Sequence, residues 1–284
     1  MTKKTAGFTL IELSIVLVII GLIVGGVLVG QDLIRAAEVR STIAQVEKYN
    51  TAVNTFRGKY NAVPGDLNAS TASAFGFTAR GTNAGQGDGN GVLECYTGAT
   101  NSGVCQGGGE TGLFWQDLSS ANGLNLNLID GSFASATTVP VAVATTATAN
   151  YMPAAKLGRG NFVYVYSANG INYYGMSVPG AIVVTTGAMP SSVSMSPQQA
   201  YNIDKKTDDG FPGTGSVTAQ YVNTTLSWAG ATITASGTIT AATAQAATTC
   251  YDNGNTGAAQ AVYSLGTAAN GGNGANCALS YRFQ

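Results

Sequence analysis

One acidic residue interrupts a long apolar segment near the start of the chain. In residues 8–30 every side chain is apolar or small except that of Glu12, with Thr9 and Ser14 as the only hydroxyls. An ionised carboxylate in an apolar medium is costly unless a cation pairs with it. We therefore expect Glu12 to have a positively charged partner.

A second set of polar residues lies in the segment GQGDGNGVLE. It offers Asp88, Asn90 and Glu94, with a backbone carbonyl near Val92. Alternating oxygen ligands on a glycine-rich loop are typical of Ca²⁺ sites. The spacing differs from that of an EF-hand loop, because the third ligand and the distal glutamate are missing. The segment is thus a candidate calcium site, and the alternative is a solvated turn.

The four cysteines fall into two local pairs, Cys95 with Cys105 and Cys250 with Cys277. Neither pair has the CxxC spacing of redox or zinc sites. In a chain that begins with an export-like segment, they predict two disulfides formed outside the cytoplasm. Closing a loop of the size between Cys250 and Cys277 contributes roughly 3 to 4 kcal/mol in the chain-entropy model.

The composition argues against catalysis and against nucleic-acid binding. The chain has no histidine, which removes the commonest general base, Ser-His triads and every histidine-containing metal site. It also lacks a GxSxG-type nucleophile motif. Only 10% of the residues are charged and the net charge is -1, whereas neutralising phosphates needs several cations. We predict a protein that is not an enzyme and does not bind nucleic acid, with Ca²⁺ as the sole candidate cofactor.

The apolar segment has the length of a membrane span. As a helix, residues 8–30 extend about 35 Å at roughly 1.5 Å per residue, enough to cross a hydrocarbon core of about 30 Å. Lys3 and Lys4 precede the segment. Because positive residues stay on the cytoplasmic side, the C-terminal bulk of the chain should lie outside the cytoplasm.

A usual signal peptide is cleaved after its apolar region, at small residues. Here the small residue Gly7 precedes that region, which predicts cleavage between Gly7 and Phe8. The new Phe8 amine would then supply the cation for Glu12, one turn away in the same chain or on a neighbouring subunit. The alternatives are an uncleaved signal anchor whose Glu12 reaches the interface, and a secretory peptide cleaved after Gly26 or Gly30.

The run GFTLIELSIVLVIIGLI closely resembles the class III signal peptide and N-terminal helix of type IV pilins and of type II secretion pseudopilins. Gly7 stands where that family has the residue before the cut, Phe8 where it has the N-methylated residue, and Glu12 at its acidic position. The resemblance implies a prepilin peptidase that cleaves between Gly7 and Phe8 and methylates the new amine. The strict motif covers about the first thirty residues, and the helix lacks the proline that many pilins have here.

Beyond Gly30, apolar residues recur at steps of three and four up to Tyr60, which predicts an amphipathic helix continuous with the membrane segment. Pro64 and Gly65 follow as stop signals. We therefore divide the chain into a removed leader (1–7), a transmembrane and filament-core helix (8–30), the amphipathic half of the helix (31–60), and a β-rich head (61–284) with a disulfide-bounded C-terminal region (250–277).

The head is rich in Gly, Ser, Thr, Ala and Asn around short apolar runs. The runs at 162–166 and 171–178 are separated by SANG, a hairpin-type turn. Further strands are predicted at 181–186, 217–222, 226–228, 232–235 and 238–241, and short helices at 114–120 and from the capping residues Ser196 and Pro197. The fold class is α+β: a long N-terminal helix with a protruding hydrophobic half, packed on an antiparallel sheet head with long loops and disulfides, as in pilins.

An acidic cluster follows the second short helix, at Asp204, Asp208 and Asp209 beside Lys205 and Lys206. We expect salt bridges at the end of that helix to account for it.

The predicted function is that of a structural subunit of a type IV pilus-like filament, in adhesion, motility, DNA uptake or secretion. The expected partners are further copies of the chain, prepilin peptidase, and the pilus assembly platform with its ATPase. Before assembly the subunit would lie in the bacterial inner membrane with a periplasmic head, and afterwards in an extracellular pilus or a periplasmic pseudopilus. The alternative is a minor or tip pilin, or a type II secretion pseudopilin, whose head is a binding module.

Overall fold

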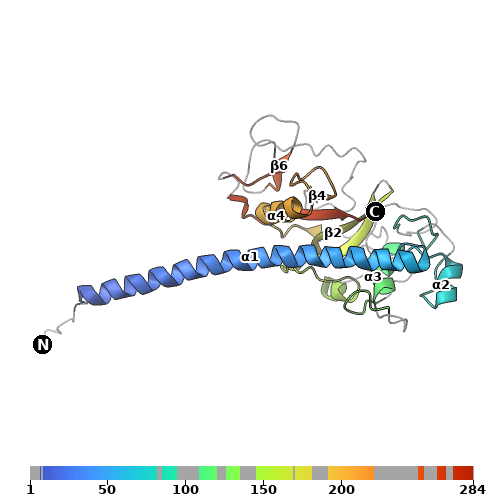
Figure 1. The fold of residues 1–284 in the computed structure, drawn as a ribbon, viewed down its shortest axis with the longest axis horizontal. Coiled ribbons are helices and arrows are strands. Elements are labelled where there is room, and N and C mark those ends of the chain that lie inside the picture. Colours follow the sequence, from blue (N-terminus) through green and yellow to red (C-terminus); the bar gives the residue numbers. More distant parts are fainter. Residues whose placement is uncertain are drawn as a thin grey trace.

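The computed structural model describes residue 7 and residues 9–81, 85–94, 109–119, 126–134, 145–168, 170–180, 191–220, 249–252, 261–266 and 271–283. One long helix, α1 (Leu10–Tyr60), runs along the whole molecule. Its first half protrudes on its own, and its second half lies against the head (Figure 1). This is the arrangement that the sequence predicts.

The two halves of α1 differ in burial because their sequences differ in pattern. The first half is apolar all round and exposed, from Leu10 to Ile34. The second half buries one face, which starts at Val39 and ends at Tyr60. The helix ends at Asn61, which adopts the left-handed conformation and donates its backbone N–H to the Arg57 carbonyl.

The head contains an antiparallel sheet in the order β1-β2-β7-β4. Its strands are β1 (Phe162–Ala168), β2 (Ile171–Pro179), β7 (Ala278–Arg282) and β4 (Val217–Gln220), and the short β3 (Ser191–Ser192) pairs with β2. The C-terminal strand β7 lies between β2 and β4 and pairs with both. The end of the chain is therefore part of the centre of the sheet.

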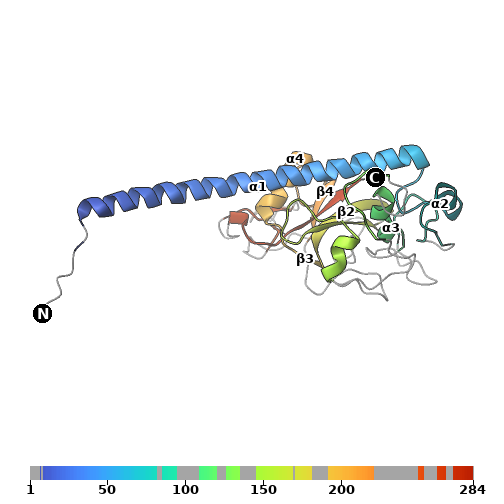
Figure 2. The same cartoon turned by 90° about the horizontal axis from the view of Figure 1, so that it is seen from below.

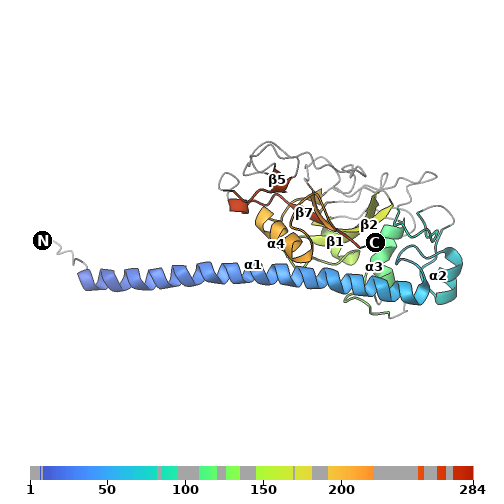
Figure 3. The ribbon, with the colours of Figure 1, turned by 45° about the horizontal axis from the view of Figure 1, so that its top comes forward.

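Four short helices and a small second sheet complete the described part of the head. They are α2 (Ala69–Phe75), α3 (Gly109–Leu118), α4 (Pro197–Thr207), the 3-10 helix η2 (Thr145–Asn150), and the pair β5 (Tyr251–Asp252) and β6 (Val262–Tyr263). Both α3 and α4 contact α1, and each also contacts the main sheet. Figures 2 and 3 show the head held along one side of α1.

Aromatic side chains join α1 to the sheet. The ring of Tyr49 on α1 lies 4.8 Å from that of Trp115 on α3 and 6.1 Å from that of Tyr174 on β2. Tyr174 stacks on Phe283 at 4.2 Å. Such contacts add about 0.5–1.5 kcal/mol per pair to ordinary apolar burial. They hold the head in place on the second half of the helix.

Most predicted elements that fall on described residues are confirmed. β1 and β2 form the predicted hairpin, β4 begins at Val217, and α4 has Ser196 as its N-cap with Pro197 in the first turn. The helix predicted at 114–120 was placed too late, because α3 begins at Gly109. The predicted strands at 181–186, 226–228, 232–235 and 238–241 lie outside the described residues. The α+β pilin architecture is confirmed.

Candidate assembly site and the C-terminal disulfide

The N-terminus of α1 is closed by a capping box between Thr9 and Glu12. The Thr9 hydroxyl accepts the Glu12 backbone N–H at 3.3 Å, and the Glu12 carboxylate accepts both the Thr9 backbone N–H and the Thr9 hydroxyl at 2.8 Å. The helix therefore begins at Leu10, and Thr9 is extended. The sequence predicts a helix from Phe8, two residues before the observed start, and it does not predict the capping role of Glu12.

The predicted cut lies directly before this cap. Gly7 is exposed and outside the helix, whereas Phe8 lies outside the described residues. A peptidase needs an accessible segment, and the exposure of Gly7 fits that requirement. Whether the Phe8 amine reaches Glu12 stays a prediction.

Within the described part of the molecule, no other segment buries the first half of α1. Its large apolar side chains are exposed on every face, with Leu10 at 85%, Leu22 at 73% and Ile34 at 61%. By length and hydropathy α1 qualifies as a membrane-spanning helix. A helix that is apolar all round requires lipid or other apolar helices around it.

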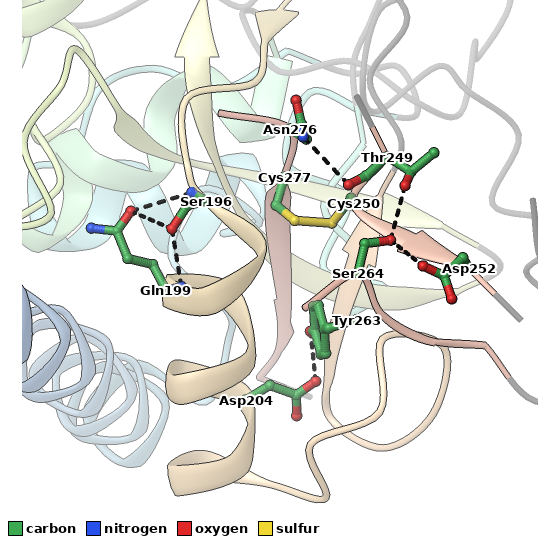
Figure 4. The surroundings of a disulfide bond; sticks show 10 residues. All are labelled: Ser196, Gln199, Asp204, Thr249, Cys250, Asp252, Tyr263, Ser264, Asn276 and Cys277. Atoms are coloured by element: carbon green, nitrogen blue, oxygen red, sulfur yellow. Dashed lines mark hydrogen bonds between the residues drawn. A yellow bond between two sulfur atoms is a disulfide. The ribbon is translucent and has the colours of Figure 1, made fainter. Parts of the chain in front are cut away.

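The structure pairs Cys250 with Cys277, as predicted (Figure 4). Both cysteines are fully buried. Cys277 directly precedes β7 and exchanges backbone hydrogen bonds with Met195, the residue before the cap of α4. The disulfide thus joins the C-terminal region to the sheet next to α4. The other predicted pair, Cys95 with Cys105, lies outside the described residues.

Buried polar contacts accompany this disulfide (Figure 4). The Tyr263 hydroxyl donates to Asp204 on α4 at 2.7 Å, and the Ser264 hydroxyl donates to Asp252 at 2.6 Å. Asp204 also accepts the Gly210 backbone N–H at 3.1 Å. Burial raises the pKa of Asp204 to about 6, although both of these donors act in the opposite direction.

The predicted salt bridges at the end of α4 are not the explanation of its acidic cluster. Asp208 instead accepts the Val217 backbone N–H at 3.1 Å, and Asp209 accepts the Phe211 backbone N–H at 2.8 Å. Lys205 donates to the Tyr201 hydroxyl. The three aspartates hold the connection from α4 to β4 through backbone groups, which residue spacing alone does not reveal.

The candidate calcium residues lie close together in one loop, where Asp88 and Asn90 are exposed and Glu94 is partly buried. The Asn90 side-chain amide lies 3.1 Å from the Asp88 carboxylate and 3.4 Å from that of Glu94. Three carboxylates, however, meet at a different place: those of Asp66, Asp88 and Glu110 have oxygens within 4.8 Å of one another. Of the predicted set, only Asp88 belongs to this group. The calcium site itself stays a prediction.

Asp66 and Glu110 are buried and bonded to the backbone of the Asp88 loop. Asp66 accepts the backbone N–H groups of Gly89 and Gly91, each at 2.7 Å. Glu110 accepts those of Gly87 and Glu94, each at 2.8 Å. Burial raises the pKa of Asp66 and of Glu110, and neighbouring carboxylates add to the rise. A divalent cation bound among these oxygens would offset the repulsion between the carboxylates, and protonation of the carboxylates would do the same.

The comparisons with known proteins concern the N-terminus. Residues 2–28 match a family model described as the prokaryotic N-terminal methylation motif. The N-terminus is a class III signal peptide of the pilin type. No curated protein and no solved structure matches the chain.

This motif supports a type IV pilin-like or pseudopilin subunit, and it indicates a structural subunit rather than an enzyme. It implies a substrate of prepilin peptidase that assembles into a filament. The apolar helix suits a membrane-anchored precursor. The methylation motif and the uncovered half of α1 thus agree with each other.

Proposed function

We propose that this chain is a structural subunit of a type IV pilus-like filament. Residues 8–30 anchor it in the inner membrane before assembly, with the head on the periplasmic side, and the same helices form the filament core afterwards. The observation that carries the proposal is the first half of α1, which is apolar and exposed on every face and which lies largely within the methylation motif at residues 2–28. In both states its surface is buried, first by lipid and then by other subunits.

Glu12 has a part in both states. In the uncleaved chain its carboxylate accepts two hydrogen bonds from Thr9, which lowers the cost of placing it in the membrane. Cleavage after Gly7 creates a charged amine on Phe8, next to this cap. We propose that in the filament Glu12 pairs with the Phe8 amine of a neighbouring subunit, and that this pairing sets the register between helices.

The test uses Glu12→Ala with Glu47→Ala as the matched control, because Glu47 is an exposed glutamate in the second half of α1. Both variants should be processed and inserted in the membrane like the wild type. Sheared surface filaments or isolated pseudopili, measured by mass spectrometry, should contain Glu47→Ala subunits and lack Glu12→Ala subunits. Glu12→Ala in filaments at the wild-type amount would contradict the register role.

The same measurement on the wild type decides its abundance. A dominant peptide that begins with N-methyl-Phe8 supports a major subunit. Trace amounts in a filament made of another subunit support the minor or tip role. Complete absence from every filament fraction would refute the proposed function.

A further inference from the structure

A polar cavity of about 330 Å³ lies between α1 and α4. Figures 1 and 3 show α4 near the end of the head from which the first half of α1 protrudes. Its size is within the range of ligand sites, about 300–1,000 Å³. One wall is the face of α1 within residues 32–39, the other is α4, and Asn273 completes the lining. The cavity is separate from the disulfide and from the carboxylate group around Asp88.

The charges in this cavity are not neutralised by each other. Arg35 and Lys206 contribute two cations to the lining, and Asp32 contributes one carboxylate. Among the described residues, the ion pairs are Lys48–Asp130 and Arg80–Asp117. The three charged groups of the cavity therefore form no ion pair with a described residue. Arg35 donates a long hydrogen bond of 3.4 Å to the Asn273 side chain. The site therefore offers two cations to an anion and one carboxylate to a cation.

Amide and hydroxyl groups make up most of the remaining lining. Gln198 and Asn202 on α4 both face the cavity, and the N-cap residue Ser196 lies at one end of that helix. Such side chains supply hydrogen-bond donors and acceptors. An occupant with a phosphate, ester oxygens and a nearby positive group would match this set.

The position of the cavity along α1 places it at the membrane surface. From Leu10 to Arg35 the helix rises about 38 Å at roughly 1.5 Å per residue. A bilayer is about 30 Å thick in its hydrocarbon core and about 40–45 Å with both headgroup layers. Leu33 and Ile34, just before Arg35, are still 67% and 61% exposed. When the apolar half spans the membrane, Asp32 and Arg35 lie at headgroup depth.

We propose that this cavity binds the headgroup of a phospholipid in the periplasmic leaflet. The phosphodiester lies against Arg35 and Lys206, and an ammonium group, as in phosphatidylethanolamine, lies toward Asp32. Binding holds the head against the membrane surface before assembly, and entry into the filament requires release of the lipid. The inference rests on the membrane-anchored state of the proposed function, but not on polymerisation.

The test is native mass spectrometry of the full-length chain in detergent, titrated with dihexanoyl-phosphatidylethanolamine. Arg35→Gln and Lys206→Gln should each weaken lipid binding about tenfold, because each removes a charge-assisted hydrogen bond. The matched control is Arg40→Gln, an exposed arginine of the same helix that does not line the cavity, and it should bind like the wild type. Melting temperatures of all variants verify that they fold.

Two further arms identify the ligand. Asp32→Asn should abolish the preference for phosphatidylethanolamine over phosphatidylglycerol, because the latter has no ammonium group. Inorganic phosphate should compete weakly, since it lacks the ester and ammonium groups. Equal binding of phosphate and lipid would overturn the headgroup assignment.

Wild-type lipid binding by both Arg35→Gln and Lys206→Gln would overturn the proposal. The proposal would also be overturned if the substitutions changed only the proportion of dimeric species. This face would then be a contact between copies of the chain. Lipid binding is measured without filaments. A failure of the filament proposal, seen with Glu12→Ala, is therefore distinguishable from a failure here.

Discussion

The ion pair between Arg80 and Asp117 gives the most quantitative prediction about the head. Both side chains are buried, at 0% and 2% exposure. One guanidinium nitrogen of Arg80 lies 2.8 and 2.6 Å from the two carboxylate oxygens of Asp117, and the Gly65 backbone N–H donates to Asp117 at 2.6 Å. Asp117 therefore joins the segment after α1, the loop after α2, and α3.

Asp117→Ala removes all of these contacts and leaves the Arg80 cation buried without a carboxylate. Breaking a buried pair in this way costs about 3–5 kcal/mol. For a domain of this size, each kcal/mol lowers the melting temperature by about 2–4 °C. We therefore expect a drop of about 10 °C. The double variant Arg80→Met with Asp117→Leu should lose less than the two single changes together, because no charge remains buried.

The assay is thermal unfolding of the full-length chain in detergent, followed by circular dichroism. Asp130→Ala is the matched control, because the Lys48–Asp130 pair is as short, at 2.5 Å, but exposed to solvent. Its melting temperature should stay close to that of the wild type. Equal losses in Asp117→Ala and Asp130→Ala would refute the reasoning that burial decides the strength of the pair.

Three further predictions concern the head. Replacing Cys250 and Cys277 together by serine should lower the free energy of unfolding by roughly 3–4 kcal/mol, because a loop with a sequence separation of 27 is then no longer closed in the unfolded chain. Urea unfolding measures this loss, and an unchanged free energy of unfolding would contradict the prediction. Burial raises the pKa of Asp204 to about 6, so the folded chain keeps a proton that the unfolded chain loses near pH 4. The stability due to that proton is complete below about pH 4 and is lost as the pH rises to about 6. Asp204→Asn should remove this pH-dependent contribution. Parallel pH curves of melting temperature for the variant and the wild type would contradict the prediction. If the predicted calcium site exists, Ca²⁺ should raise the melting temperature and a chelator should reverse that rise. Asp88→Asn should abolish the effect of Ca²⁺. An unchanged melting temperature in chelator would rule out the site.

The long helix and its two halves could be predicted from the sequence because they depend on local patterns. Apolar residues on every face give the exposed half, and spacing of three and four gives the half that packs. The cap of α4 at Ser196 and the hairpin of β1 and β2 are local as well. The pairing of Cys250 with Cys277 followed from their isolation from the other two cysteines.

Features that depend on distant contacts could not be predicted. α3 includes Gly109 and Glu110, and the Glu110 carboxylate accepts backbone N–H groups of the Asp88 loop. A glycine run does not indicate a helix. The same contacts bring Asp66 and Glu110 to Asp88, although Asp66 and Glu110 are far from it in sequence. In the sequence Gly65 is a stop signal for the helix, and in the structure it also lies against α3, where a Cβ would come within 2.2 Å of the Glu110 carbonyl oxygen.

The mass of the mature N-terminus tests the central claim most directly. Intact mass and N-terminal peptide analysis of the chain from its native host should show Phe8 as the first residue, with a methyl group on its amine. The helix of residues 8–30 should still be attached. A mature chain that begins at Met1, or one cut after residue 30, would contradict the account.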